Sequence, residues 1–281
     1  MIVSAIVSVY NAERFLRGCL DDLRAQTIAD DVEIIVVDAA SPQNEAAIVR
    51  EYDGVVYLRA PQREPLYASW NRGIRAARGT YVTTANADDR HRRDALERLV
   101  DALERDRGAA LAYADAAVTM RENATFDDTR PPVFHRWPDF DRRRLFRAAF
   151  IGPQPLWRRE LHERYGWFDE SFATAGDYEW WLRLAAAGER FVHIAEPLTL
   201  YLASASSIEH RDPQLNWRES EAARERHWRA EWGARPRPGG VFLRPDLPFV
   251  ASRLLRGDLA PAAEMLAHAR MLVHGRSRRS S

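Results

Sequence analysis

Short apolar runs alternate with helix-like segments along the first 120 residues of this 281-residue chain. The apolar runs are rich in β-branched residues, and the segments between them repeat apolar residues at helical spacing. Strands that alternate with helices build a parallel sheet with helices on both faces, so the sequence predicts an α/β fold with a doubly wound sheet. The expected strands cover residues 2–9, 33–38, 55–58, 80–85 and 109–118; the expected helices cover residues 12–26, 66–77 and 91–107, and another begins at Ser41-Pro42.

The pattern changes after Met120. Residues 121–138 are polar, carry prolines and have no clear period, which is typical of a long functional loop. Residues 235–248 are rich in Pro, Gly and Arg and indicate a linker to a helical C-terminal piece with a basic tail. Between these segments the sequence predicts a helix at 139–149, a strand at 155–158, a helix at 177–187 and two short strands that flank Pro197 within 190–202.

The composition argues against several classes of protein. The 41 basic and 41 acidic residues cancel, which removes the electrostatic argument for a nucleic-acid-binding protein. The single cysteine, Cys19, cannot form an intramolecular disulfide, and its apolar helical neighbours predict a small buried side chain in a reducing compartment. The apolar N-terminus lacks the basic region and cleavage site of a signal peptide, and no apolar run is long enough to span a membrane. We therefore expect a cytoplasmic protein that touches a membrane only at its surface.

Two adjacent carboxylates, Asp88 and Asp89, follow the strand expected at residues 80–85. In an open parallel sheet the ligand crevice lies beyond the carboxyl ends of the strands, so the segment Asn86-Ala-Asp88-Asp89 should lie at that crevice. Mg²⁺ and Mn²⁺ prefer carboxylate oxygens and share their coordination with waters and substrate phosphates. Adjacent like charges cost energy unless a cation or a basic group compensates for them. The acid pair therefore predicts a site for a metal ion that carries a diphosphate.

Two structural alternatives stay open for the acid pair. One carboxylate could cap a helix beginning near His91, although capping would not explain the second carboxylate. Arg90, Arg92 and Arg93 are close in the sequence and could compensate for the two charges without a metal.

Asp38 closes the second expected strand and by the same argument lies at the ligand crevice. The following Ala39-Ala40 offer no further carboxylate, so Asp38 suits hydrogen bonds from a nucleobase or ribose better than a cation. The alternative is an Asp that caps the helix starting near Pro42. Tyr10 ends the first strand and could stack on a base, whereas Asn11 could cap the next helix.

A further candidate opens the helix expected at residues 177–187. Asp177 follows Gly176 at the helix N-terminus, where the macrodipole favours a negative charge. An ionised, oriented carboxylate can act as general base for an attacking hydroxyl, and a helix-capping role is the alternative of equal weight. Later in the chain, His210 could reach the cation through an imidazole nitrogen, but its spacing resembles no standard metal motif.

In combination these segments resemble the family 2 inverting glycosyltransferases of the GT-A fold. The resemblance covers about residues 1–210 and rests on the order and spacing of the segments, each of which is modest alone. They are Val3-Ser-Ala-Ile-Val-Ser-Val-Tyr-Asn-Ala12, Ile34-Ile-Val-Val-Asp38, Trp70-Asn71-Arg-Gly73-Ile, Gly79-Thr-Tyr-Val82, Asn86-Ala-Asp88-Asp89, Phe168-Asp-Glu-Ser-Phe172 and Gly176-Asp177-Tyr-Glu-Trp-Trp-Leu-Arg183.

The resemblance implies a GT-A type, Rossmann-like, doubly wound mixed sheet with a helical C-terminal extension. Residues 1–110 would form the nucleotide-sugar-binding half of the domain and residues 111–215 its acceptor-binding half. Residues 216–281 would form the C-terminal helical extension and basic tail, which could contact a membrane surface.

The implied reaction moves a sugar from a nucleotide diphosphate sugar to an acceptor hydroxyl, with inversion at the anomeric carbon. The expected donor is UDP-linked. A bound Mg²⁺ or Mn²⁺ would neutralise the departing diphosphate as a Lewis acid. The acceptor would be a glycan or lipid-linked glycan of a bacterial surface or secreted polysaccharide. Carried over by position, Asp177 is the catalytic base; Tyr10, Asp38, Asn71, Asn86 and Asp88 bind the donor; and Asp88, Asp89 and His210 hold the metal.

The sequence also departs from the family pattern. Asn86 stands in place of the first acid of the usual acid-x-acid segment, Ala39-Ala40 replace a more acidic turn, and Gly176 stands where an acid often precedes the base. These departures keep open a nucleotide-sugar-binding protein without turnover. A nucleotidyltransferase, which would release pyrophosphate, is a further alternative, but no Gly-rich basic phosphate loop follows the first strand.

Overall fold

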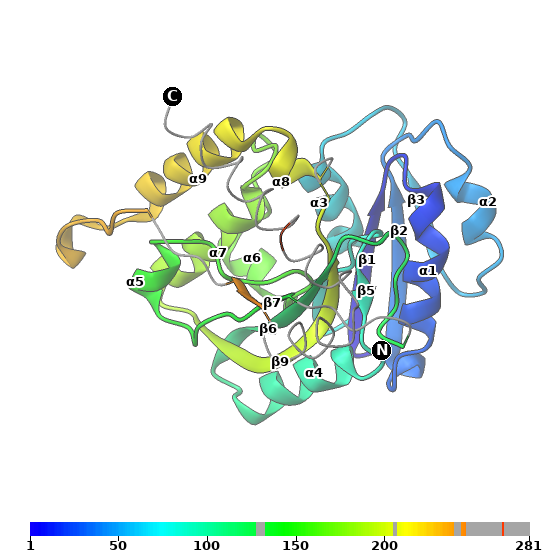
Figure 1. Cartoon of the computed structure of the whole chain (residues 1–281), viewed down its shortest axis with the longest axis horizontal. Coiled ribbons are helices and arrows are strands. Elements are labelled where there is room, and N and C mark those ends of the chain that lie inside the picture. Colours follow the sequence, from blue (N-terminus) through cyan, green and yellow to red (C-terminus); the bar gives the residue numbers. More distant parts are fainter. Residues whose placement is uncertain (128–132, 205–206, 239–242, 246–265, 267–281) are drawn as a thin grey trace.

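The computed structural model describes residues 1–127, 133–204, 207–238, 243–245 and 266. Within these residues the chain forms a ten-stranded mixed sheet in the order β10-β7-β6-β8-β4-β1-β2-β3, and β9 pairs with both β5 and β6 (Figure 1). The strands are β1 (Val3–Val9), β2 (Val32–Asp38), β3 (Val56–Arg59), β4 (Tyr81–Thr84), β5 (Arg90–His91), β6 (Ala109–Thr119), β7 (Val133–His135), β8 (Leu156–Arg158), β9 (Arg190–Leu202) and β10 (Leu243–Pro245). The α-helices are α1 (Glu13–Arg24), α2 (Glu45–Val49), α3 (Leu66–Ala76), α4 (Ala95–Arg105), α5 (Arg142–Leu145), α6 (Leu161–Tyr165), α7 (Gly176–Ala186), α8 (Ile208–Arg211) and α9 (Pro213–His227).

The first four strands form the parallel part of the sheet, as the alternating sequence predicts. β2 and β3 lie on one side of β1 and β4 lies on the other, so the winding of the chain reverses between β1 and β4. Open α/β sheets bind ligands at such a switch point, beyond the carboxyl ends of the strands. The fold therefore brings Tyr10, which follows β1, and residues 86–89, which follow β4, to the same edge of the sheet.

Helices cover both faces of the sheet (Figure 1). The buried faces of α1, α2 and α4 form one hydrophobic cluster with Ala5 and Val7 of β1. Ile6 of the same strand points into the opposite cluster, where Trp70 of α3 and Trp180 of α7 are buried. Because alternate residues of β1 face different cores, the strand is covered on both faces, and its two serines, Ser4 and Ser8, form hydrogen bonds with Glu33 and Trp70.

The strand β9 corrects the expectation of two short strands around Pro197. It is continuous from Arg190 to Leu202 and runs parallel to β6. The β6–β9 register shifts on both sides of Asp115, the residue paired with Pro197. A proline cannot donate a ladder hydrogen bond, and the local irregularity accommodates it without ending the strand.

Other predicted boundaries also move because of long-range pairing. The helix expected from His91 begins only at Ala95, since residues 90–91 form β5 and pair with β9. The segment 121–138, expected as a loop, contains β7, which pairs with β6. The expected helix at residues 139–149 is reduced to the single turn α5.

The helix expected at Ser41-Pro42 starts at Glu45, because the preceding turn binds the N-terminus of α1. α1 begins after Ala12 and has no side-chain cap of its own, so the predicted capping role of Asn11 is wrong. Side chains of the turn supply the acceptors instead. Ser41 Oγ, Glu45 Oε1 and Gln43 Oε1 accept the backbone N–H groups of Asn11, Ala12 and Glu13 at 3.0, 2.9 and 3.1 Å.

The C-terminal part of the described chain is not separate from the sheet domain. α9 packs along α7, and the boundary expected between residues 215 and 216 falls inside this helix (Figure 1). Much of the expected linker at 235–248 and nearly all of the helical piece and basic tail beyond it lie outside the described residues. None of the described helices combines the length and the apolar character needed to cross a membrane.

Candidate active site

Asp89 is a structural carboxylate in this conformation. It is 1% exposed, and its two oxygens accept hydrogen bonds from the backbone N–H of Leu202 at 2.9 Å and from Nδ2 of Asn86 at 3.0 Å. These bonds tie the segment after β4 to the end of β9. Burial and the neighbouring Asp88 raise the pKa of Asp89 well above its usual range. Asn86 is committed to the same turn, so the amide that replaces an acid here orients Asp89.

Asp88 has different surroundings from its neighbour. It is partly buried, and no hydrogen bond or ion pair joins its carboxylate to another residue of the described chain. Burial raises the pKa of Asp88, and the positive charge of Arg14 acts in the opposite direction. The site thus holds a carboxylate whose charge the protein compensates poorly.

The basic residues that could have compensated for the acid pair bind elsewhere. Arg90 forms a two-pronged ion pair with Asp22, with N–O distances of 2.6 and 2.7 Å. Arg92 binds Asp94 at 2.6 Å and Glu196 at 3.1 Å. α4 begins at Ala95, so neither carboxylate of the acid pair caps it. Two of the three proposed basic partners and the capping alternative are therefore ruled out by the structure.

The predicted metal site depends on Asp88 as a single protein ligand and not on a complete set of protein ligands. Among the described residues, no group of three or more His, Cys, Asp or Glu side chains is placed to hold a metal ion. Mg²⁺ is commonly held by one or two carboxylates, with waters and substrate phosphates completing the coordination. Asp88 fits that mode as a single ligand. His210 belongs to α8, but its side chain lies outside what the structure describes, and its metal role stays a prediction.

Asp38 lies at the end of β2 and is fully buried. Its Oδ1 accepts the backbone N–H of Ser41 at 2.6 Å, while Oδ2 accepts hydrogen bonds from the Tyr57 hydroxyl and the Arg59 guanidinium group. Burial and the bond to Asp38 raise the pKa of Tyr57. Asp38 fixes the turn after β2 and does not cap α2, because that helix starts at Glu45. A nucleobase could reach this carboxylate only if the half-exposed Arg59 moved aside.

Tyr10 presents an accessible ring at the end of β1. Its relative exposure is 39%, and the guanidinium carbon of Arg63 lies 3.3 Å from the ring centroid. The ring face therefore already accepts a flat cationic group in this structure. A planar base would find a comparable stacking surface there.

Asn71 is buried and its amide is used within the protein. Nδ2 donates to the carbonyl oxygen of Phe168 at 2.9 Å and to Glu170 Oε1 at 2.8 Å, and Oδ1 accepts the N–H of Phe168 at 3.0 Å. Both Nδ2 hydrogens are thus occupied. In this structure Asn71 joins α3 to the segment before α7 and does not face a donor.

Asp177 is the second residue of α7, whose cap residue is Ala175. Its Oδ1 accepts hydrogen bonds from the backbone N–H of Tyr178 at 2.8 Å and from the hydroxyl of Tyr67 at 3.2 Å. Burial and the negative charge of Asp177 raise the pKa of Tyr67, so this hydroxyl stays a donor. The carboxylate is therefore oriented by a helix N-terminus and by a side chain of α3.

Gly176 makes this arrangement possible. A Cβ atom at this position would lie 2.7 to 2.9 Å from three ring carbons of Tyr67, which is closer than carbon atoms approach without displacement. An acid in place of Gly176 would therefore push Tyr67 away from Asp177. The close packing of the Tyr67 ring therefore explains why a glycine stands here in place of the acid that is common in the family.

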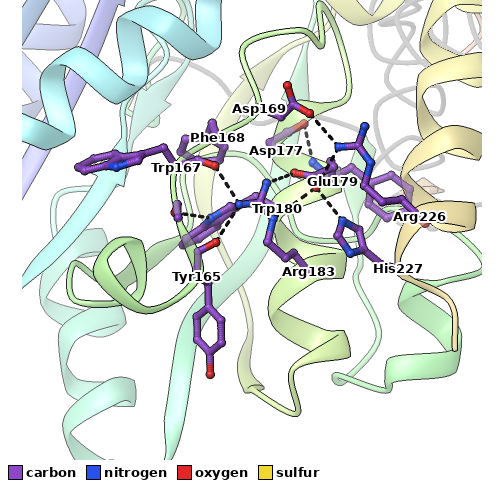
Figure 2. Close-up of polar contacts among 12 residues, drawn as sticks. Tyr165, Trp167, Phe168, Asp169, Asp177, Glu179, Trp180, Arg183, Arg226 and His227 are labelled. Carbon is purple, nitrogen blue, oxygen red and sulfur yellow. Dashed lines mark hydrogen bonds and ion pairs between the residues drawn. The ribbon is translucent and has the colours of Figure 1, made fainter.

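Glu179, on the same helix, belongs to a buried ionic network (Figure 2). It binds Arg183 on α7 and His227 on α9, with an Nε2–Oε1 distance of 2.6 Å for the histidine. Arg226 of α9 lies 3.5 Å from the same carboxylate and 2.7 Å from Asp169. Burial opposes ionisation of Glu179, but its hydrogen bonds with His227 and Arg183 and the positive charge of Arg183 hold its pKa below the usual value.

Sequence reasoning missed two residues that bind Asp177 or the loop before it. Tyr67 lies 110 positions before the carboxylate that it binds. Glu219 of α9 binds the loop that leads into α7, 44 to 46 positions away. Neither belongs to a recognisable motif or stands at an informative spacing, so only the fold reveals them.

Comparisons with known proteins agree with this architecture. Residues 4–162, more than half of the chain, match the family model described as Glycosyl transferase family 2. The uncharacterized glycosyltransferase EpsJ of Bacillus subtilis (strain 168) is 29% identical over 219 residues, which cover 74% of this chain and 62% of EpsJ. Chondroitin synthase of Escherichia coli is 24% identical over 196 residues, which cover 69% of this chain and 28% of that protein. The chain thus spans less than two thirds of the length of these relatives.

Solved structures of similar fold include two sugar-nucleotide complexes. The mannosyltransferase PcManGT from Pyrobaculum calidifontis, in complex with GDP-Man and Mn²⁺, has a TM-score of 0.65 at 20% identity and is matched over 99% of this chain and 83% of its own. S. aureus TarS 1–349 in complex with UDP-GlcNAc has a TM-score of 0.64 at 15% identity, over 79% of this chain and 66% of its own. These likenesses confirm the expected mixed α/β fold of the GT-A type. Together with the family match, they establish that this chain belongs to glycosyl transferase family 2.

Proposed function

We propose that this chain transfers a sugar from a nucleoside-diphosphate sugar to an acceptor hydroxyl, with inversion at the anomeric carbon and with the help of Mg²⁺ or Mn²⁺. The donor is UDP-linked, and the acceptor is a glycan or lipid-linked glycan of a bacterial polysaccharide. The reaction takes place in the cytoplasm, where the C-terminal extension can touch the inner face of the membrane.

The proposal depends mainly on the surroundings of the Asp88 carboxylate. It lies at the topological switch point of the sheet, next to a second acid, and no cationic side chain of the described chain pairs with it. A partly buried carboxylate in that setting is costly unless a ligand brings positive charge. A divalent cation that carries a diphosphate supplies that charge.

Tyr10, Asp38 and Asp88 are proposed to act on the donor. Tyr10 offers an aromatic face for the base, and Asp38 lies at the adjacent strand end with a charge that now binds Arg59. Asp88 would hold the cation, which when bound supplies Lewis-acid neutralisation of the leaving diphosphate. Because the diphosphate leaves as a stabilised anion, the protein needs no second acid to protonate it, unlike a glycosidase with its two carboxylates.

Asp177 is proposed to take the proton of the attacking hydroxyl. Its place at the N-terminus of α7 favours the negative charge that a base needs. Its bond from Tyr67 restricts the direction of the carboxylate, and orientation is a large part of what a general base contributes. One base and one metal ion suffice for this reaction.

The choice of donor is supported by what similar folds bind. TarS was solved with UDP-GlcNAc, whereas PcManGT was solved with GDP-Man and Mn²⁺. At these identities the fold is shared, and the nucleotide is a matter for experiment. UDP, GDP, UDP-GlcNAc and GDP-mannose are therefore the appropriate first probes.

The first experiment measures binding of UDP and GDP by calorimetry with Mn²⁺, with Mg²⁺ or with EDTA. We expect one nucleotide to bind tightly only with the cation, and Asp88→Asn to lower that affinity by about tenfold to 100-fold, as is usual for a lost charged contact. Asp101→Asn is the matched control, because Asp101 is a half-exposed acid of α4 whose ion pair within the described chain is with Arg105 at 3.0 Å. Equal, cation-independent binding by wild type and Asp88→Asn would contradict the metal role.

The second experiment measures release of nucleoside diphosphate from a panel of nucleotide sugars. Asp177→Asn should lower the turnover rate by more than about 100-fold and leave nucleotide affinity unchanged, since the base acts on the acceptor. Release of pyrophosphate instead would identify a nucleotidyltransferase. Tight nucleotide-sugar binding without any release, in the presence of bacterial glycan acceptors, would identify a binding protein.

A further inference from the structure

Glu219 of α9 makes an unusual set of contacts with the segment that leads into α7. Its Oε1 accepts the N–H of Ala173 at 2.8 Å, and its Oε2 accepts the N–H groups of Thr174 at 2.8 Å and Ala175 at 3.0 Å. The hydroxyl of Thr174 donates to the same Oε2 at 2.9 Å. One side chain thus binds three consecutive backbone donors and a hydroxyl.

These donors lie directly before the proposed base. Ala175 is the cap residue of α7, and this helix has no side-chain cap from its own segment. The N–H groups at a helix start have no acceptor within the helix. Glu219 of α9 accepts the N–H of the cap residue Ala175 and the two N–H groups that precede it. The conformation of residues 173–175 therefore depends on α9.

The other side of the same turn is fixed by α3. Tyr67 contacts Gly176 and donates its hydroxyl hydrogen to Asp177, and Tyr67 is itself buried between Trp70 and Phe168. Asp177 therefore stands at the meeting point of two constraints. α3 contacts its side chain, and α9 holds the backbone that leads to it.

The ionic network of α9 keeps Glu219 in position. Arg226 binds Asp169, which precedes the Glu219-bound segment, and His227 binds Glu179 on α7 (Figure 2). Arg224 of the same helix is buried and hydrogen-bonded to the carbonyl oxygen of Phe146. α9 is thereby attached to α7, to Asp169 before it and to Phe146 at the end of α5, whereas the family model ends at residue 162, before α9 begins.

The geometry points to Glu219 as a positioning residue for Asp177. Through α9 it holds residues 173–175 in the conformation that presents the base to the acceptor. This inference rests on the proposed function of Asp177. It adds that the C-terminal helix is part of the transfer machinery.

The test compares Glu219→Gln and Glu219→Ala with wild type and with Glu225→Gln. Glu225 is an exposed acid of the same helix and serves as the matched control. The assay is release of nucleoside diphosphate from UDP-GlcNAc or GDP-mannose, whichever the wild-type protein turns over. Hydrogen exchange of the amides at residues 173–175 is measured by mass spectrometry on the same proteins, and UDP and GDP affinity with Mn²⁺ is measured by calorimetry.

We expect both Glu219 variants to lose about tenfold or more in kcat, because a small misplacement of a catalytic group is costly. The donor KM and the nucleotide Kd should stay within about twofold of wild type, since the donor side is untouched. The amides of residues 173–175 should exchange faster in both variants. Glu219→Gln should lose less than Glu219→Ala, because its remaining carbonyl oxygen still accepts hydrogen bonds.

Three outcomes overturn the inference. The first is a Glu219→Ala protein with wild-type kcat while Asp177→Asn is inactive, which leaves the proposed function standing. The second is unchanged exchange at residues 173–175 in both Glu219 variants. The third is a parallel loss of kcat, nucleotide affinity and melting temperature, because that result indicates general unfolding. Full activity of Asp177→Asn would remove the proposed base itself, and this separates the failure of the function from the failure of the positioning role.

Discussion

The contact between Gly176 and Tyr67 gives the sharpest stability prediction. Gly176 is the first residue of α7, and its φ lies outside the positive range, so alanine is allowed there by the backbone. An added Cβ would nevertheless lie 2.7, 2.8 and 2.9 Å from the Cε2, Cδ2 and Cζ atoms of Tyr67. The ring has little room to retreat, because it is 1% exposed and packs on Trp70 and Phe168 with centroid distances of 5.3 and 5.9 Å.

Two opposing effects decide the magnitude for Gly176→Ala. Replacing glycine by alanine at a compatible position stabilises by about 0.4 to 1 kcal/mol, because the unfolded chain loses freedom. Forcing an extra methyl group into a well-packed core costs about 1 to 3 kcal/mol. The contact should dominate, with a net loss of about 1 to 2 kcal/mol in the free energy of unfolding. For a chain of this size that corresponds to a fall of several degrees in melting temperature.

Urea unfolding and nucleoside-diphosphate release measure the two consequences. Displacement of the Tyr67 ring should also weaken its hydrogen bond to Asp177 and lower kcat without changing nucleotide affinity. Gly108→Ala is the matched control, since its Cβ would lie equally close, at 2.7 Å, to Nη2 of Arg190, the movable end of a half-exposed side chain. If Gly176→Ala proved as stable and as active as Gly108→Ala, the reasoning about the rigid ring would be refuted.

Three further predictions follow from buried groups. Asn71→Ala removes three buried hydrogen bonds and should lower the free energy of unfolding by about 2 to 4 kcal/mol in urea, and a loss below about 1 kcal/mol would contradict the bridging role. Burial lowers the pKa of His162 from 6.5 to about 4, and the neutral ring accepts from Trp157 at 3.0 Å while its other nitrogen faces the Gly166 carbonyl oxygen at 3.1 Å. Between these pH values the unfolded state therefore binds a proton that the folded state does not bind, so the free energy of unfolding should fall by up to about 3 kcal/mol as the pH drops from 6.5 to 4. In His162→Gln the free energy of unfolding should change less steeply with pH. An unchanged pH dependence in this variant would exclude His162 as its source. Cys19 is fully buried and burial raises its pKa, so a thiol reagent should label it only after unfolding, and rapid labelling of the native protein would show that the site is open.

The parallel part of the sheet was predictable because its signals are local. β1, β2, β3 and β4 match the expected apolar runs to within one or two residues. The position of Asn86 to Asp89 at the edge of the sheet followed from the rule that parallel strands end at the same side. Cys19 is buried as its helical neighbours predict.

Elements that depend on distant partners were misjudged. Pro197 predicted a break between two strands, but β9 continues through this residue because the β6–β9 register shifts there. The short strand β5 replaces the first turn expected for α4, because β9 pairs with it. No local pattern reports the presence of a pairing strand about 100 residues away.

At the candidate site, too, local features could be predicted from the sequence and long-range contacts could not. Asp88, Asp89 and Asp177 could be chosen as candidates from the sequence, because charge pairs and helix starts are visible there. Their surroundings were not visible there: Asp89 is hydrogen-bonded to Leu202, whereas no residue of the described chain forms a hydrogen bond or ion pair with the Asp88 carboxylate. Asn71 resembles a donor-binding residue in its motif, yet the fold uses its amide to join α3 to the segment before α7.

The sequence alone determined the family, the order of strands and helices, and the edge of the sheet where the acids gather, since each of these depends on residue type and spacing along the chain. Only the tertiary structure decided which acid of the pair is hydrogen-bonded within the protein, and it also brought Tyr67 and Glu219 to the turn that carries Asp177. The physical reason is that the cost of a buried charge and the direction of a carboxylate depend on the atoms within a few ångströms. In this protein those atoms come from helices far apart in the chain.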